Sequence, residues 1–443
     1  MKIIFCLHHF LPDFVGGTEI YVSNLAKQLQ QNNIEAVVLI PNLGIDKTEE
    51  YIHEGIRVIR YAENSIEDRA MILGKKKPDG LQEFSAIIKN ENPGLVHFHE
   101  LAPGRGINLF HVEEVHILKI PLVITFHVPF YTCLRGSLLY KGHTKCDGKI
   151  NIKKCTACMY QQKNITGIKG TLLNEVAMAL FHFHINPTRL NSSVGTAFGF
   201  PFVIDKMRKD LLRLTFLAEK IVVIADWYRE VLKRNHVPND KMIYIKQGLP
   251  NAKAASHIST EITLPIRVVY IGRITPLKGL HLLIEAVLQL PPEKIFLDIY
   301  GNDTADNYVS SWKEKTKDTK NINWKGKVAS SAVIGTLSNY HLLCIPSVFE
   351  MSPLVIQEAF AAGLPVLASD VYGNAEQIKD AENGWLFRQN DPVDLKFKLE
   401  NIIRNPNLIV EVKKNIPAAN TFEKVGTDHI ALYSSLLNNY KRD

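Results

Sequence analysis

Two glutamates, Glu350 and Glu358, flank the expected start of a helix in the second half of the chain. Ser352 is a good N-cap residue and Pro353 suits the first helical position, so we expect the helix to run to about Ala362. The free backbone N–H groups at such a helix start attract anions, and a carboxylate nearby can accept hydrogen bonds from a diol. The pattern therefore suits a ligand with phosphates and a ribose, although paired glutamates are also common on solvated helix faces.

A second group of residues with chemical potential, Gly272, Arg273 and Lys278, lies between an expected strand at 268–271 and an expected helix at 279–289. Glycine lets the backbone approach a ligand closely, and two cations can neutralise the charge that develops on a leaving diphosphate. Each motif is weak by itself. Because both motifs lie at strand ends of the same expected sheet, a shared binding site is favoured over the chance occurrence of two unrelated motifs.

In these motifs the chain resembles the retaining glycosyltransferases of family 4, the "group 1" glycosyl transferases, which have the GT-B fold. The resemblance covers most of the chain, and its specific part is YIGRITPLKGL at 270–280, the two glutamates with EAFAAGLPVLASD at 358–370, and NGWLF at 383–387. The chain departs from the family at residues 351–353, where Met-Ser-Pro replaces the Gly-Phe-Gly run of many members. Contacts to the donor sugar are therefore expected to differ, and the sugar is left open.

The resemblance implies roles for the residues of both motifs. Arg273 and Lys278 would bind the phosphates of a nucleotide-sugar donor. Glu350 would contact the transferred sugar near the reacting carbon, and Glu358 would hold the ribose of the nucleotide. The further donor-binding positions in these motifs are Gly272, Ser352, Leu354 and Val355.

Two features of the first half also correspond to positions of the resembled family. Gly16 and Gly17 follow the first expected strand and open a helix, where glycine lets the backbone approach a phosphate or sugar. His127 follows the expected strand at 122–126 and matches a family histidine near the transferred sugar. A plain strand-to-helix turn and a structural histidine are the alternatives. The expected catalytic residues are His127, Glu350, Arg273 and Lys278, with Gly16 and Gly17 in the donor-binding set.

Strands and helices that alternate along both halves of the chain must position these residues. In the first half, apolar runs predict strands at residues 3–7, 36–40, 56–60, 95–98, 122–126, 221–224 and 242–245. In the second half, they predict strands at 268–271, 295–300, 322–324, 342–345 and 365–368. Such alternation indicates parallel sheets. We expect an α/β protein of GT-B type, with two Rossmann-like doubly wound parallel-sheet domains facing a central cleft.

The expected domain boundaries follow from composition. Residues 1–250 form an N-terminal, acceptor-side domain that carries a cysteine-rich and helical insertion at about 129–217. A polar stretch at 251–264 is the expected linker, and 265–420 forms the nucleotide-sugar domain. Residues 421–443 contain a last helix that is expected to pack back on the first domain.

Four of the six cysteines cluster in the insertion, at Cys133, Cys146, Cys155 and Cys158. Thiolates with a CxxC pair favour Zn²⁺, and the expected cytoplasmic setting disfavours disulfides. The hypothesis is a structural zinc knuckle that shapes the acceptor side, with free thiols as the alternative. Retaining transfer in the resembled family needs no metal, so no catalytic cofactor is expected.

The overall composition excludes some classes of partner. The net charge of +7 is a mild, scattered excess that suits an anionic small molecule or lipid surface and does not indicate nucleic acid. The start of the chain is expected to be a buried strand and not a signal peptide, and no apolar run is long enough to span a membrane. Phenylalanines at 181–202 beside a basic segment at 206–213 suggest weak peripheral membrane contact, with core packing as the alternative. The expected location is the cytoplasm or the inner face of its membrane.

The sequence therefore predicts a retaining, hexosyltransferase-like enzyme that moves a sugar from a UDP- or GDP-sugar to a saccharide or lipid-linked acceptor. Bacterial surface polysaccharide or glycoconjugate synthesis is the expected setting. One alternative is a nucleotide-sugar epimerase with the same architecture. The other is a carbohydrate-binding protein without catalysis, against which the intact set of charged residues argues.

Overall fold

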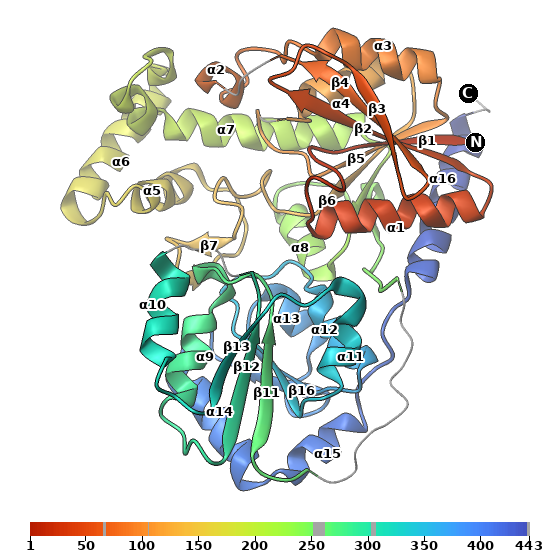
Figure 1. Cartoon of the computed structure of the whole chain (residues 1–443). Helices are drawn as coiled ribbons and strands as arrows, with labels where there is room; N and C mark the ends of the chain where they lie inside the picture. Colours follow the sequence, from red (N-terminus) through yellow and green to blue (C-terminus); the bar gives the residue numbers. More distant parts are fainter. Residues whose placement is uncertain (65–67, 105, 251–261, 303–306, 441–443) are drawn as a thin grey trace. The chain divides into compact units, whose positions relative to one another are not determined.

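The computed structural model describes the chain apart from residues 65–67, 105, 251–261, 303–306 and 441–443. It divides into two compact units, Met1–Lys246 with Phe422–Asp443, and Gln247–Thr421 (Figure 1). The expected linker at 251–264 lies mostly outside the described residues. Each unit is built on its own parallel sheet.

The sheet of the first unit has eight strands in the order β10-β9-β6-β5-β1-β2-β4-β3. The strands are β1 (Lys2–Cys6), β2 (Glu35–Leu43), β3 (Glu49–His53), β4 (Ile56–Glu63), β5 (Leu95–His99), β6 (Leu122–Phe126), β9 (Lys220–Val223) and β10 (Met242–Tyr244). All neighbours pair in parallel except β3, which is antiparallel to β4 at the edge. The central strands β1, β5 and β6 are almost completely buried and mostly apolar, as expected for a sheet covered on both faces, and β5 also buries His97 and His99.

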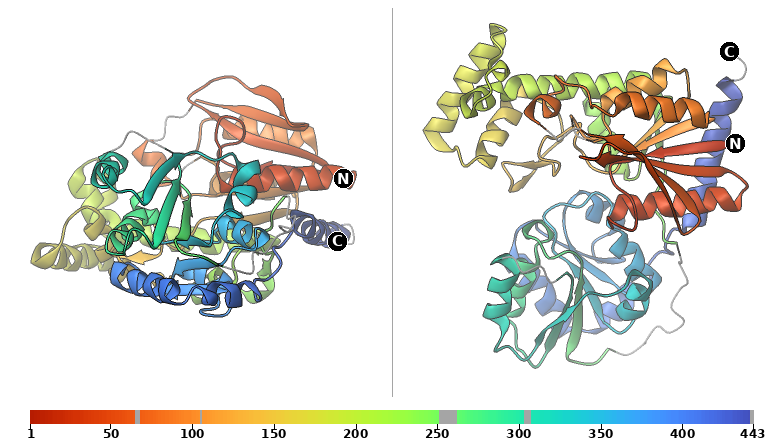
Figure 2. Two further views of the ribbon diagram at one scale, coloured as in Figure 1. Left: turned by 60° about the horizontal axis from the view of Figure 1, so that its bottom comes forward. Right: turned by 45° about the horizontal axis from the view of Figure 1, so that its top comes forward.

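Helices cover this sheet and extend beyond it. Those beside the sheet are α1 (Gly17–Gln31), α2 (Arg69–Ile72), α3 (Leu81–Glu91), α4 (Leu109–Ile117), α8 (Asp226–Arg234) and α16 (Phe422–Tyr440). Helix α16 returns from the far end of the chain and packs against α1 within this unit. The insertion contains the small hairpin β7 (Leu139–Tyr140) and β8 (Thr144–Lys145), and the helices α5 (Ile152–Gln162), α6 (Gly167–His182) and α7 (Ser193–Leu217). Helices α5, α6 and the start of α7 project beyond the sheet (Figures 1 and 2).

The sheet of the second unit has six parallel strands in the order β13-β12-β11-β14-β15-β16. They are β11 (Ile266–Ile271), β12 (Ile295–Tyr300), β13 (Ile322–Gly326), β14 (Leu342–Ile345), β15 (Val366–Ser369) and β16 (Gly384–Phe387). Numbered along the chain within the unit, this is the doubly wound order 3-2-1-4-5-6. The strand order reverses between β11 and β14, which makes their carboxyl ends the place where such sheets bind ligands.

Two apolar clusters hold the helices of this unit against opposite faces of the sheet. The helices are α9 (Leu280–Val287), α10 (Asn307–Thr316), α11 (Val333–Leu337), α12 (Leu354–Ala361), α13 (Tyr372–Gln377), α14 (Pro392–Arg404) and α15 (Asn407–Lys413). Alternating residues of β11 serve the two clusters, with Val268 in one and Val269 in the other. The predicted α/β architecture of two doubly wound parallel-sheet domains is confirmed. The edge strand β3 and the strand β16 were not among the strands predicted from sequence.

Candidate functional site

The two motifs of the second half meet at the reversal point of its sheet. Gly272 and Arg273 follow β11, and Ser347 and Glu350 follow β14, which pairs directly with β11. Residues far apart in the sequence are therefore neighbours at one sheet edge. A pocket of about 200 Å³ opens there, lined by Tyr270, Ile271, Gly272, Arg273, Lys278, Cys344, Ile345, Ser347, Glu350, Pro353, Leu354 and Val355.

An ion pair joins the two motifs across this pocket. Lys278 Nζ lies 2.6 Å from Glu350 Oε1, and the Ser347 hydroxyl donates to the same oxygen at 2.7 Å. Glu350 is only 8% exposed, so its carboxylate depends on these two partners to offset the loss of water. The Arg273 side chain is exposed and makes no ion pair within the part of the chain that the structure describes. It is therefore available to an anionic ligand.

Close backbone packing holds the two motifs in register. Gly279 ends the short turn η3 (Pro276–Lys278) with φ of 68°, and a Cβ there would lie 1.9 Å from the carbonyl oxygen of Pro346. Glycine is required at this position because the left-handed backbone conformation and the close contact with Pro346 each disfavour a side chain. Gly373 is held in the same way, since a Cβ there would meet the Met351 carbonyl oxygen at 2.3 Å. These contacts fix Lys278 beside Glu350.

Helix α12 begins one residue later than predicted. Its N-cap residue is Pro353, no side chain caps it, and Ser352 lies before the helix. The predicted N-cap role of Ser352 is therefore wrong, because the backbone of Pro353 is extended (φ −70°, ψ 120°) and becomes helical only at Leu354. The helix start nevertheless points into the pocket, since Pro353, Leu354 and Val355 line it.

Glu358 lies in the middle of α12, partly buried and outside the residues that line the pocket. Burial raises the pKa of its carboxyl to about 7. At neutral pH the group is therefore present in both protonation states and can donate or accept a hydrogen bond. This property suits a partner with hydroxyl groups, although its role as a ribose ligand stays a prediction.

Of the predicted donor-binding residues, the structure thus brings together Gly272, Arg273, Lys278, Glu350, Leu354 and Val355, with Ser352 and Glu358 beyond the pocket wall. The sequence did not single out Ser347 or Tyr270. The Tyr270 hydroxyl donates to the Arg273 carbonyl at 2.8 Å and so orients the loop after β11. A signal for Ser347 was present, because it is a small polar residue directly beyond a buried apolar strand.

The predicted residues of the first half lie in the other unit. Gly16 is the N-cap residue of α1 and Gly17 its first helical residue, with no heavy atom near the place of a Cβ on Gly17. His127 follows β6, is 6% exposed and has its Nε2 at 2.8 Å from Nδ1 of His99. Burial lowers the pKa of His127 to about 3, so the ring is neutral at pH 7. Its place beside a sugar stays a prediction.

His127 belongs to a buried network of histidines and tyrosines that connects two helices and two strands of the first unit. His97 contacts the Tyr433 hydroxyl at 2.6 Å and the Thr125 hydroxyl at 2.8 Å. The Tyr21 hydroxyl lies 2.7 Å from His429 Nε2. Because Tyr433 and His429 lie on α16, this polar network fixes the returning helix to β5, β6 and α1.

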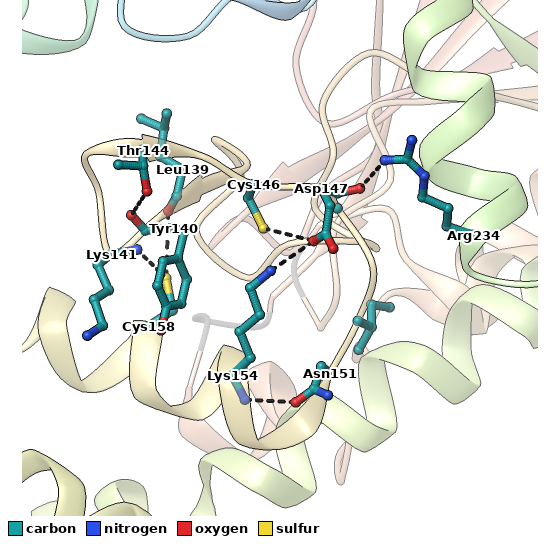
Figure 3. A network of polar contacts seen from close by, with 12 residues as sticks. Leu139, Tyr140, Lys141, Thr144, Cys146, Asp147, Asn151, Lys154, Cys158 and Arg234 are labelled. Carbon is teal, nitrogen blue, oxygen red and sulfur yellow. Dashed lines mark hydrogen bonds and ion pairs between the residues drawn. The ribbon is translucent and has the colours of Figure 1, made fainter. Parts of the chain in front are cut away.

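The four cysteines of the insertion line a single small cavity of about 30 Å³. The Cys158 Sγ accepts from the Lys141 backbone N–H at 3.1 Å and donates to the Leu139 carbonyl, while Cys146 Sγ faces Asp147 (Figure 3). Burial raises the pKa of the Cys155 thiol to about 11. Among the described residues, no group of three or more His, Cys, Asp or Glu is arranged to hold a metal. The structure therefore does not support the predicted zinc knuckle at Cys133, Cys146, Cys155 and Cys158.

Comparison with known proteins agrees with this geometry. Residues 255–418 match the family of glycosyl transferases group 1, and residues 15–163 match glycosyltransferase family 4. The structure is similar over 99% of both chains to sucrose-phosphate synthase from Thermosynechococcus elongatus, with a TM-score of 0.65 and 16% identity. It is also similar to HepE of Anabaena in complex with UDP-glucose, over 98% of this chain and 100% of that one, with a TM-score of 0.61 and 14% identity. The chain has the GT-B fold.

Two curated relatives of the chain are named as glycosyltransferases. The poly(ribitol-phosphate) alpha-N-acetylglucosaminyltransferase of Staphylococcus aureus is 28% identical, over 47% of this chain and 42% of its own length. The amylovoran biosynthesis glycosyltransferase AmsK of Erwinia amylovora is 24% identical, over 43% and 48%. The GT-B chain thus aligns with about half the length of the curated relatives that it matches.

Within the described residues of this GT-B protein, no helix is both long enough and apolar enough to cross a bilayer.

Proposed function

We propose that this protein transfers a sugar from a nucleotide-sugar donor to a hydroxyl acceptor, and that the pocket of the second unit binds the donor. The observation that carries the proposal is the Lys278–Glu350 pair at the reversal point of the sheet, next to the exposed Arg273 and the start of α12. Cations and free N–H groups converge there with a buried carboxylate. A diphosphate joined to a sugar has the complementary chemistry.

Each residue then has a definite task. The guanidinium of Arg273 and the ammonium of Lys278 bind the diphosphate and stabilise the negative charge that grows on it as the bond to the sugar breaks. Glu350, held by Ser347 and Lys278, accepts hydrogen bonds from the sugar or stabilises positive charge at its reacting carbon. Glu358 bonds the ribose diol from α12.

We propose retention of configuration for the transfer step, on the resemblance to the retaining family. The bond between the sugar C1 and the diphosphate oxygen breaks, and its electron pair stays on the diphosphate. The acceptor oxygen forms the new bond to C1 from the same face. Its proton passes to an oxygen of the leaving diphosphate, so the step needs no metal.

The proposed substrates are a UDP- or GDP-hexose as donor and a saccharide or lipid-linked acceptor in bacterial surface polysaccharide synthesis. A structurally similar protein holds UDP-glucose, which supports a nucleotide-sugar donor. A relative named for amylovoran biosynthesis supports a polysaccharide product. The epimerase and the non-catalytic binding protein are not favoured, because the matched families are transferases and the charged residues of the pocket are all present.

A thermal-shift screen with UDP-, GDP-, ADP- and TDP-sugars tests the donor site. A ligand at 100 times its Kd stabilises the folded state by about 2.7 kcal/mol, so the true donor should raise the melting temperature clearly. Arg273→Ala should abolish that rise, because it removes a charge that bonds the diphosphate. Arg404→Ala is the matched control, since Arg404 is an exposed arginine of the same unit outside the pocket. An undiminished shift in Arg273→Ala would refute the assignment of the phosphate site.

A structural zinc ion at the four cysteines stays a separate proposal. It rests on the soft thiols and their position around one cavity, although among the described residues no group of three or more His, Cys, Asp or Glu is arranged as a ligand set. Elemental analysis should then find about one zinc per chain. Cys155→Ser with Cys158→Ser should lose the metal and melt at a lower temperature. Metal-free protein that is unaffected by a chelator would identify the cysteines as buried thiols.

A further inference from the structure

Helix α6 of the insertion has two faces with different surroundings. Each residue of an α-helix is rotated by about 100° about the helix axis from the residue before it. Gly170, Asn174 and Ala177 therefore lie on one face of α6. All three are buried where α6 packs against α5 and α7. Gly170 also fits closely, since a Cβ there would lie 2.9 Å from the Ile165 carbonyl oxygen. The packed face fixes which residues point outward.

The outward face of α6 carries a stripe of large apolar side chains, which we call the α6 stripe. Its residues on the helix follow helical spacing, with exposed fractions of 80% for Ile168, 62% for Leu172 and 49% for Val176, and the C-cap residue Phe183 adds a fourth apolar side chain that is 70% exposed. Four large apolar residues on one helix face are a continuous patch, unlike isolated exposed residues elsewhere on the surface. Helix α6 itself projects beyond the sheet of the first unit (Figures 1 and 2).

The surroundings of the stripe are basic. Residues 149–194 contain six basic residues against the single acid Glu175, and the six are Lys149, Lys153, Lys154, Lys163, Lys169 and Arg189. Lys153 pairs with Glu175, and Lys154 pairs with Asp147. Lys163, the C-cap residue of α5, and Lys169, in the first turn of α6, are exposed and make no ion pair within the described ranges. The stripe is thus bordered by positive charge that the protein itself does not neutralise.

The basic segment at 206–213, which the sequence suggested for membrane contact, is a different kind of surface. Lys206 pairs with Asp210 at 2.5 Å, and Arg208 and Lys209 both pair with Asp205. Its apolar residues Met207 and Leu211 are buried in the unit, and only Leu212, at 36%, is exposed. Core packing, the alternative interpretation of this segment, is therefore what the structure shows.

We propose that the α6 stripe docks on an anionic lipid surface, with the stripe inserted at the headgroup boundary and Lys163 and Lys169 on the lipid phosphates. An apolar helix face bordered by lysines has the chemistry of an interfacial helix. Charge complementarity selects this occupant, because each lysine near an anionic leaflet adds attraction that an apolar protein partner does not offer. The surface is separate from the donor pocket, so the proposal stands or falls apart from sugar transfer.

Vesicle co-sedimentation of the full chain tests the proposal. The protein should bind vesicles of phosphatidylglycerol and phosphatidylcholine, should not bind vesicles of phosphatidylcholine alone, and should be released by high salt. Ile168→Ser with Leu172→Ser and Val176→Ser should weaken binding at least about tenfold, since it removes most of the inserted apolar area. Lys163→Gln with Lys169→Gln should weaken binding and its salt dependence, and leave the apolar area unchanged.

Ile117→Ser is the matched control, because Ile117 on α4 is 68% exposed and lies outside the stripe. All variants should keep the wild-type melting temperature, which shows that the substitutions act at the surface alone. Absence of wild-type binding to anionic vesicles would overturn the proposal, and so would unchanged binding in the stripe variant. A wild-type dimer that the stripe variant converts to a monomer, without vesicle binding by either, would identify the stripe as an interface between two copies.

Discussion

Lys278→Met is expected to lower the rate of sugar transfer by about 10²–10³-fold, the usual effect of removing one preorganised charge from a reacting group. The variant keeps most of the unbranched side chain and removes the cation that lies 2.6 Å from Glu350. The diphosphate then loses one of two cations that stabilise its developing charge. Steady-state rates with the donor identified by thermal shift, with kcat and KM separated, measure the loss.

The same substitution should also destabilise the protein, because Glu350 is left buried with only Ser347 as partner. Removing one member of a buried pair costs about 3–5 kcal/mol. Lys278→Met combined with Glu350→Gln should recover most of this stability and none of the activity. Melting curves in the absence of ligand measure this difference.

The surface pair Lys379–Glu382 of the same unit supplies the matched control, since its side chains are 74% and 56% exposed. Lys379→Met should leave both activity and melting temperature unchanged. If Lys278→Met transfers sugar at the wild-type rate, the pocket described here is not where the diphosphate leaves.

Each of the two short sequence motifs that form the pocket of the second unit could be predicted from sequence by itself. Glycine, arginine and lysine after one apolar run, and glutamate after another, are local signals of strand carboxyl ends. Their meeting in space depends on β11 pairing with β14 across a separation of some seventy residues. Only the general rule for doubly wound sheets made that pairing foreseeable. The exact helix start was not foreseeable, because Pro353 can be the first helical residue or the residue before it.

The histidine network shows what the sequence could not give. Tyr21 and His429 are separated by 408 residues, and no periodicity connects them. His97 and His99 alternate with apolar residues in β5, a pattern that also fits exposed side chains. Their complete burial results from the packing of α16 onto the sheet, which is tertiary information. The outward face of α6 could not be predicted for the same reason. The packing of α5 and α7 against the helix decides which of its faces is buried.

This network leads to the second large effect, a loss of stability of the first unit in acid. Burial lowers the pKa of His127 and His429 to about 3 and holds the pKa values of His97 and His99 well below their usual range. In the unfolded chain each histidine has a pKa of about 6.5. Between these values the unfolded state binds more protons, so stability is complete above about pH 6.5 and falls as the pH decreases toward 3.

Each histidine of the network should cost roughly 1.5–2 kcal/mol of stability between pH 6.5 and pH 5. Glu100 acts in the opposite direction, because burial raises the pKa of its carboxyl to about 7 and the folded state binds its proton first. The stabilisation from protonating one carboxyl offsets only part of the stability that four histidines lose, so the protein is destabilised overall as the pH falls. Hydrogen exchange should show early opening of α16, β5 and β6 as the pH is lowered, before the strands of the second unit open.

His429→Gln isolates one histidine of the set. The amide oxygen of glutamine can still accept from the Tyr21 hydroxyl, but it cannot take up a proton. The variant should therefore lose less stability than the wild type on going from pH 7 to pH 5, by about the share of one histidine. His182→Gln, at an exposed position of α6, should leave the pH dependence unchanged. If wild type and His429→Gln lose the same stability between pH 7 and pH 5, the histidine network does not determine the acid sensitivity. Removing a buried histidine that takes up a proton on unfolding must otherwise reduce that loss.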